Sequence, residues 1–308
     1  MRSSIARAQR RPGHEFTDHA DRARMNSVNR IVEVVTILAG IFLIAVGSAQ
    51  AQLAFQGFET DTGDWTPITT RVPAGGGALS LPSASGNYHA ELTNVHDSYL
   101  PGYGGAEYSF FGFTAPPPFP GDFSQSIDMY VFADWPLAIY NGPGVWIDMS
   151  PTQANFGGEH NFRLTPTASA VAVEVAVDGQ TTPIVTITTS GWYKFQMTYR
   201  KGAQPTDLVS TDMNVFDTSD NLLGTTTVVS NSPGGPLFSQ DLGGPGYVWI
   251  TVWPNGWAND MLAIDNVRAD LLRPTKDNCK NGGWKNFVLD PGPFKNQGQC
   301  VSYFAART

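Results

Sequence analysis

The stretch that decides the fold is Val171-Ala-Val-Glu-Val-Ala-Val-Asp178. Its four valines occupy every second position, and alanine or an acidic residue stands between them. Successive side chains of a β-strand point to opposite faces, so this alternation predicts a strand with one buried and one wet face. The segment from Tyr193 to Arg200 repeats the pattern, because large apolar side chains alternate there with Lys, Gln, Thr and Arg.

Further strands are predicted where the same alternation recurs between Gly, Pro, Ser and Asn breakers, at 126–133, 145–149, 184–189, 211–217, 222–229 and 247–253. No helical stripe of useful length follows residue 51. About ten strands, each with one wet face, predict two antiparallel sheets packed face to face. We therefore expect an all-β jelly-roll sandwich over residues 52–273.

Composition excludes several classes of protein. The chain has 308 residues, of which 12% are aromatic and only 15% charged, with 32 Gly and 22 Pro. This is too apolar for a disordered chain and too rich in turn formers for an all-helical one. The net charge is −8, whereas a nucleic-acid-binding protein needs a basic face. We expect no nucleic-acid partner.

The N-terminal residues 1–51 are predicted to be a leader with a signal helix. The uncharged run from Val34 to Val46 follows Arg30 and precedes small residues that end at Ala51, as in a cleaved signal peptide. The run is shorter than the roughly 20 residues that span a bilayer, although an uncleaved membrane anchor is the alternative. Translation starts at Met1 or at Met25. The protein is expected to be secreted or held at the cell surface.

Export also fixes the expected state of the two cysteines, Cys279 and Cys300, which both lie in the tail, residues 274–308. An oxidising compartment favours a disulfide between them. Two cysteines in a tail without histidine do not make a structural zinc site, which takes four such ligands. We expect a small tail closed by one disulfide.

The ends of the predicted sandwich resemble known modules. Gly57-Phe58-Glu59, with Trp65 soon after, and Ile264-Asp265-Asn266-Val267-Arg268 are similar to the first and last strands of exported bacterial jelly-roll modules related to carbohydrate-binding modules and laminin-G-like lectin domains. The resemblance implies a structural calcium ion.

Glu59, Asp61 and Asp265 would supply oxygen ligands to that ion, and backbone carbonyls would complete its shell. The sequence has Asn266 where many of these modules have a second Asp, which lowers the charge of the site. In the alternative interpretation, Asp265 is a turn or edge carboxylate bonded to backbone amides.

The tail resembles a short C-terminal segment of many exported bacterial and archaeal proteins. The similarity lies in Cys279-Lys-Asn-Gly-Gly-Trp284-Lys-Asn-Phe287 and in Phe294-Lys-Asn-Gln-Gly-Gln-Cys300. It implies export and a Cys279–Cys300 bridge with Trp284 and Phe294 packed around it. It implies no activity.

Catalytic motifs are absent from the sequence. There is no G-x-S-x-G, H-E-x-x-H or P-loop, and no E-x-D-x-x-E run of the kind found in jelly-roll glycosidases. Of the histidines after the leader, His89 sits in a predicted strand, where a structural role is expected. His160 follows Gly157-Gly158 in a predicted loop, so we expect it to be exposed and available to a ligand.

Three tryptophans suggest a binding surface for sugars, because a pyranose ring packs on an exposed aromatic face while polar neighbours bond its hydroxyls. Trp249 and Trp253 alternate with Ile250 and Val252, and Trp257 follows the next turn. If Ile250 and Val252 face the core, the tryptophans share the wet face. Alternatively, this strand is central and buried on both faces, or the tail covers it.

The sequence thus predicts a non-catalytic exported module that recognises a glycan or surface polymer, with Trp249, Trp253, Trp257 and His160 as candidate ligand-binding residues. One alternative is a polysaccharide lyase or hydrolase with an unrecognised site. Another is a structural or adhesive surface protein. Apart from calcium we expect no cofactor, and a membrane contact only through an uncleaved signal segment.

Overall fold

The computed structural model describes residues 50–63, 65, 69–93, 107–109, 122–135, 144–150, 160–177, 180–229, 236–240, 242, 249–255, 261–272, 274, 276–287 and 292–306. The predicted signal segment lies almost entirely outside these residues. Within them, no helix is long and apolar enough to cross a membrane.

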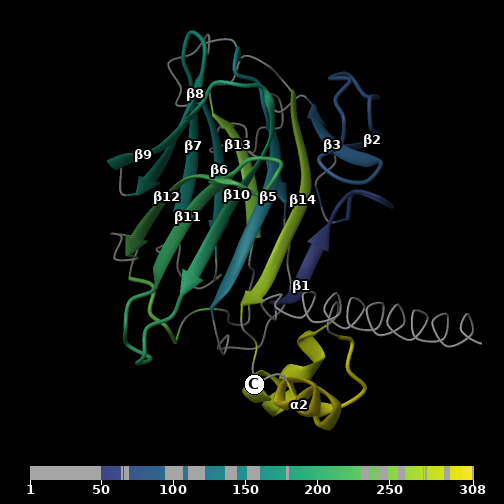
Figure 1. Ribbon diagram of the computed structural model, residues 1–308, viewed down its shortest axis with the longest axis vertical. Helices are drawn as coiled ribbons and strands as arrows, with labels where there is room; N and C mark the ends of the chain where they lie inside the picture. Colours follow the sequence, from purple (N-terminus) through teal and green to yellow (C-terminus); the bar gives the residue numbers. More distant parts are fainter. Residues whose placement is uncertain are drawn as a thin grey trace, which may run out of the picture. The chain divides into compact units, whose positions relative to one another are not determined.

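Eight strands form the larger of two antiparallel sheets, and five of them lie side by side in Figure 1 from β12 to β14. Their order is β12–β11–β10–β5–β14–β3–β2, and β1 also pairs with β14. The strands are β1 (Gln50–Gln56), β2 (Thr69–Pro73), β3 (Tyr88–Thr93), β5 (Phe123–Val131), β10 (Gly191–Arg200), β11 (Ser210–Phe216), β12 (Leu222–Val229) and β14 (Met261–Leu272).

Six strands form the second sheet, in the order β4–β13–β6–β7–β8–β9. They are β4 (Glu107–Ser109), β6 (Gly144–Ser150), β7 (His160–Pro166), β8 (Val171–Val177), β9 (Gln180–Ile187) and β13 (Trp249–Asn255). All pairings in both sheets are antiparallel. The predicted all-β, two-sheet sandwich is therefore confirmed.

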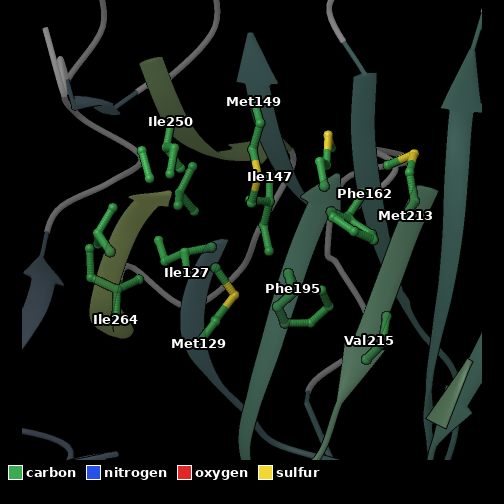
Figure 2. Close-up of a cluster of buried hydrophobic side chains, with 14 of the residues drawn as sticks. Ile127, Met129, Ile147, Met149, Phe162, Phe195, Met213, Val215, Ile250 and Ile264 are labelled. Atoms are coloured by element: carbon green, nitrogen blue, oxygen red, sulfur yellow. The ribbon is translucent and has the colours of Figure 1, made fainter. Parts of the chain in front are cut away.

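The core lies between the two sheets, as Figure 2 shows for side chains from both. In β8, Val171, Val173 and Val175 are at most 1% exposed, so the alternation in the sequence identified the inner face correctly. Phe195 of β10 meets Phe162 of β7 edge to face across the sandwich, with ring centroids 5.4 Å apart. Edge-to-face geometry is favoured by the ring quadrupoles and adds to the gain from burial.

The predicted strand positions were less accurate at the start of the domain. β1 ends at Gln56, so Gly57-Phe58-Glu59 follows the first strand and does not form it. The strand also begins at Gln50, where it pairs with Leu272, so cleavage after Ala51 would remove its first two residues. The first and last strands of the sandwich, β1 and β14, pair antiparallel.

An irregularity divides β14 into two halves. Its first half pairs with β3 up to Ile264, and its second half pairs with β1 from Val267 onward, along the same edge. Between them the register with β5 shifts, and Asn266 has a φ of +46°. Asparagine tolerates this left-handed conformation better than most residues. The sheet therefore gains a β-bulge at its centre.

The tail contains two helices that were not predicted from the sequence: the 3₁₀-helix η2 (Lys276–Asn286) and the α-helix α2 (Gln297–Ala305). In α2, Cys300 and Phe304 are four residues apart, so they share one buried face. Asn296 caps this helix by accepting a hydrogen bond from the Gln299 N–H at 2.9 Å. Nine residues are too short for an obvious helical stripe.

The predicted disulfide joins Cys279 of η2 to Cys300 of α2. Phe294 is buried, and Trp284 is partly buried and packs against the same hydrophobic cluster, which also contains the two cysteines. The aromatic core of the tail is instead built from Phe287, Phe294 and Phe304, with ring centroids 5.1–6.0 Å apart. A segment this small needs both the bridge and these rings to remain folded.

Truncating Phe195 should test the core. The side chain is fully buried, so Phe195→Ala removes a ring from between the sheets and leaves a cavity. We expect the free energy of unfolding to fall by about 3–5 kcal/mol, measured by urea denaturation. Val229→Ala, at a side chain that is 49% exposed, should change it by less than about 0.5 kcal/mol. Equal midpoints for the two variants would contradict this assignment of the core.

Reducing the disulfide should loosen the tail alone. Closing a loop of this length stabilises the folded tail by roughly 3 kcal/mol. A reductant should therefore make the chain susceptible to cleavage by trypsin at Lys280, Lys285 and Lys295, as followed by mass spectrometry. The melting transition of the sandwich should stay unchanged. The double variant Cys279→Ser/Cys300→Ser is the control, because its cleavage should not depend on the reductant. Resistance of the reduced wild-type tail to trypsin would oppose the prediction.

Candidate ligand-binding site

The predicted tryptophan surface lies at the border of the described residues. Ile250 and Val252 are 1% and 0% exposed, so the expectation that they face the core is confirmed. Trp249 and Trp253 occupy alternate positions of β13, but their side chains lie outside the described residues, as does the whole of Trp257. The tryptophan surface stays a prediction.

The prediction that His160 is exposed is wrong. This residue opens β7 and is fully buried, opposite Met149 of β6. The stretch His160-Asn-Phe-Arg-Leu alternates as a strand does, and His160 shares the inner face with Phe162 and Leu164. The two glycines at 157 and 158 suggested a loop, and the prediction extended this loop into what is the first residue of β7. His160 is therefore not a surface contact for a ligand.

His89 has the structural role that we expected. It is fully buried in β3. The centroid of its ring lies 5.7 Å from that of Trp192, and its Nδ1 atom lies 3.4 Å from the Ser83 hydroxyl oxygen. Burial lowers its pKa, which the neighbouring Glu91 carboxylate opposes. A histidine held neutral under a loop contributes to packing.

The three predicted calcium ligands are not gathered into one site. Among the described residues, no three His, Cys, Asp or Glu side chains are placed to hold a metal ion. Glu59 accepts hydrogen bonds from the main-chain N–H groups of Asn87 and Tyr88. Asp61 is exposed and bonds to Gln56. The alternative in which Asp265 binds backbone amides agrees with the geometry, and calcium binding stays a prediction.

A pocket of about 610 Å³ opens on the outer face of the eight-stranded sheet. Its floor consists of polar side chains that alternate with core residues on three adjacent strands: Ser126 and Asp128 of β5, Lys194 and Gln196 of β10, and Arg268 and Asp270 of β14. These strands are far apart in the sequence but neighbours in the sheet. The pocket is therefore built on three paired strands inside the sheet.

Strand register arranges the floor in rows across the sheet. In one row Lys194 lies opposite Asp128, and Asp128 opposite Asp265. In the next, Gln196 lies opposite Ser126, and Ser126 opposite Arg268. Directly opposite residues have Cβ atoms about 5 Å apart, so each row places hydrogen-bonding groups side by side.

Both cations of the pocket are held by carboxylates. The Arg268 guanidinium donates to both oxygens of Asp270, at 2.5 and 2.9 Å. The Lys194 ammonium donates to Asp220 in the turn after β11. A bidentate guanidinium–carboxylate pair has a fixed geometry, so Arg268 is held in place while it remains 40% exposed.

Burial raises the pKa values of the carboxyl groups around the bulge. The pKa of Asp128 rises to about 6, although a hydrogen bond from the Asn266 side-chain amide, 2.8 Å long, and the Lys194 charge oppose the rise. Burial raises the pKa of Asp265 to about 7, against its bonds from main-chain amides. Burial also raises the pKa of Asp270.

Aromatic rings flank the floor on two sides. Phe55 of β1 lies opposite Arg268 and is 44% exposed. A Cβ atom at Gly57 would come within 2.8 Å of the Phe55 ring, so a larger residue there would displace this ring. On the other side, Phe216 of β11 lies opposite Lys194 and is half-buried. Trp192 also lines the pocket but is 5% exposed.

The loop of residues 74–87, between β2 and β3, forms one wall and contributes Ala84 to the pocket lining. Asp265 accepts hydrogen bonds from the N–H groups of Ala84 and Ser85, at 3.1 and 3.2 Å. The Trp192 indole donates to the Pro82 carbonyl at 2.8 Å. Buried groups of the sheet thus fix the wall in place.

Sequence reasoning missed this pocket. Its signal was the polar half of each alternating strand, such as Lys194 and Gln196 on the predicted strand 193–199. A strand's pairing partners cannot be derived from its own pattern, so the meeting of β5, β10 and β14 could not be read from the sequence.

No protein-family model matches the chain, and no curated protein matches it in sequence. Among solved structures, the chain is similar to an endo-1,3-beta-glucanase from Streptomyces sioyaensis, with 13% identity, a TM-score of 0.43, and coverage of 75% of this chain and 99% of the other.

It is also similar to arcelin-5, a lectin-like defense protein from Phaseolus vulgaris, with 9% identity, a TM-score of 0.36, and coverage of 70% of this chain and 97% of the other. A PL-14 alginate lyase from Aplysia kurodai matches with 9% identity, a TM-score of 0.34, and coverage of 60% and 83%. Similarity this distant carries no argument about function, so the proposal below depends on the geometry of the pocket.

Replacing Asp265 should separate its two interpretations. If the carboxylate anchors the 74–87 loop, Asp265→Ala leaves buried amides without a partner and costs about 1–3 kcal/mol. In that case its melting temperature should fall equally in millimolar calcium and in a chelator, and the wild type should melt at the same temperature in both. A rise of the wild-type melting temperature in calcium that Asp265→Ala abolishes would establish the calcium site instead.

Proposed function

We propose that this protein is an exported, non-catalytic module that binds a carbohydrate in the pocket on the outer face of the eight-stranded sheet. One observation carries the proposal: a pocket of about 610 Å³ with polar rows as its floor and Phe55 and Phe216 at its flanks. Its volume lies within the range of about 300–1,000 Å³ that is usual for small-molecule sites.

The lining has the chemistry that a sugar needs. A pyranose presents hydroxyl groups around its edge and an apolar C–H face, so it requires fixed donors and acceptors beside exposed ring surface. Gln196 and Ser126 supply neutral donors and acceptors, and Arg268 supplies guanidinium donors that Asp270 holds in position. Because these groups stand on paired strands, little ordering is needed on binding.

The disulfide in the tail is consistent with an extracellular location. Export through the segment from Val34 to Val46 is part of the proposal, with the mature protein beginning near Gln52. Among the described residues, none that lines the pocket belongs to the tail.

A second candidate function is a polysaccharide hydrolase or lyase, which one observation favours. Asp128 lines the pocket with its pKa raised to about 6, and such a carboxyl group can serve as a general acid near neutral pH. A hydrolase also needs a second carboxylate about 5–9.5 Å away. The neighbouring Asp220 and Asp270 are both engaged by cations.

Glycan binding should depend on the floor and the flanking rings. We expect a panel of soluble oligosaccharides, tested by isothermal titration calorimetry, to contain a ligand whose affinity falls roughly tenfold in Gln196→Ala and in Phe216→Ala. Thr227→Ala, on the outer face of the same sheet beyond the pocket, is the matched control and should bind as the wild type does. Trp253→Ala tests the alternative surface on β13.

Three outcomes would contradict the proposal. A loss of binding in Trp253→Ala alone would move the site to the six-stranded sheet. Release of products from the panel, abolished by Asp128→Asn, would make the protein an enzyme. Absence of any bound glycan would favour a structural or adhesive role.

A further inference from the structure

We propose that the pocket selects a glycan that carries a protonated amine and rejects uronates, with Asp128 as the residue that receives the amine. This inference rests on the proposed function, because it names the class of sugar that the same site binds. It follows from the charges of the pocket and from which of them are already neutralised.

The charged groups of the lining are unequal in number. Among the described residues that line the pocket, four carboxylates, those of Asp128, Asp217, Asp220 and Asp270, accompany two cationic side chains. Both cations are engaged, Lys194 by Asp220 and Arg268 by Asp270. Within the described part of the chain, neither Asp128 nor Asp217 forms an ion pair.

The two remaining carboxylates differ in what they bind. Asp217 accepts hydrogen bonds from the N–H groups of Ser219 and Asn221 and from the Asn221 side chain. Asp217 therefore stabilises the turn after β11. Asp128 accepts one hydrogen bond, from Asn266 to its Oδ2 atom. Its Oδ1 atom has no hydrogen-bond partner among the described residues, and the side chain is partly exposed in the pocket.

Position favours Asp128 as the recognition group. It stands in the middle strand of the floor, between Lys194 on β10 and Asp265 on β14. A carboxylate that is withdrawn from water and forms no ion pair gains more from a bound ammonium group than an exposed carboxylate does. A uronate would instead place a second anion beside Asp128, where both described cations of the pocket are already paired with other carboxylates.

The charge of the whole sandwich acts in the same direction. Residues 52–273 contain 7 basic and 21 acidic side chains. A field of this sign attracts cationic polymers and repels anionic ones at long range. Local and long-range electrostatics therefore select the same class of glycan.

Preference for the amine should also vary with pH. Burial raises the pKa of Asp128, and the groups that face it are Lys194, Asp220, Asp265 and the neutral Asn266. As pH rises from about 5 to about 7, Asp128 loses its proton and gains the charge that an ammonium group requires. Affinity for the amine-bearing sugar should increase as Asp128 ionises, until the pH at which the sugar's own ammonium group begins to lose its proton, whereas affinity for a neutral sugar should not change.

The test compares three oligosaccharides of equal length by calorimetry at about pH 6, where Asp128 is partly ionised and the amine of glucosamine keeps its proton: a glucosamine oligomer, its N-acetylated counterpart and a uronate oligomer. We expect the amine-bearing oligomer to bind about tenfold or more tightly than the acetylated one, with the advantage reduced by salt, and the uronate not to bind. Asp128→Asn should abolish the advantage and leave the affinity for the acetylated oligomer unchanged. Asparagine can still accept the hydrogen bond from Asn266, so the fold should persist.

Asp212→Asn is the matched control, because it removes a carboxylate from the outer face of the same sheet outside the pocket and should retain the preference. If Gln196→Ala weakens binding of the acetylated oligomer but the amine gives no advantage, this inference fails and the proposed function stands. If the uronate binds most tightly, the inference is also overturned. If no oligomer binds, or if pocket variants change nothing, the proposed function itself fails.

Discussion

The β-bulge in β14 at Asp265 and Asn266 is the feature on which the rest of the structure depends. It ends the pairing with β3 and begins the pairing with β1, so it brings the first strand of the domain beside the last. It also directs the Asn266 amide to Asp128 and the Asp265 carboxylate to the 74–87 loop. A regular strand would offer neither group in these positions, because its side chains alternate strictly between the two faces.

Buried carboxylates anchor the 74–87 loop at several points. Glu91, which is 2% exposed, accepts hydrogen bonds from the N–H groups of Ala78 and Leu79, at 2.8 and 3.0 Å. Gly77 has a positive φ, and a Cβ atom there would approach the Glu91 carboxylate to 2.4 Å, so no other residue fits without displacement. A loop has no ladder of hydrogen bonds to neighbouring strands, so these side chains supply the acceptors that its main-chain N–H groups need. They convert a surface connection into a fixed wall of the pocket.

The sequence was sufficient for the sandwich because each half-buried strand carries its own pattern, as Val171 to Val177 shows. It was insufficient where a strand begins directly after glycines, as at His160, and where a helix is too short to show a stripe, as at Cys300 and Phe304. The pocket could not be predicted from the sequence for a different reason. Asp128, Lys194 and Arg268 belong to strands that are paired only in the folded sheet, and the bulge that aims Asn266 depends on three strands at once.

Preorganisation of the pocket has a cost in stability that the pKa values reveal. Burial raises the pKa values of Asp128 and Asp265 above those of the unfolded chain, so both groups bind protons more tightly in the folded state. Such groups stabilise the fold at acidic pH, and this contribution is lost as pH rises from about 4 toward 6 and 7. Asp265 offsets this loss by binding main-chain amides of the 74–87 loop, whereas Asp128 lines the pocket with a single hydrogen bond. A carboxyl group kept at the floor of a pocket although its ionisation weakens the fold is the arrangement expected of a binding site.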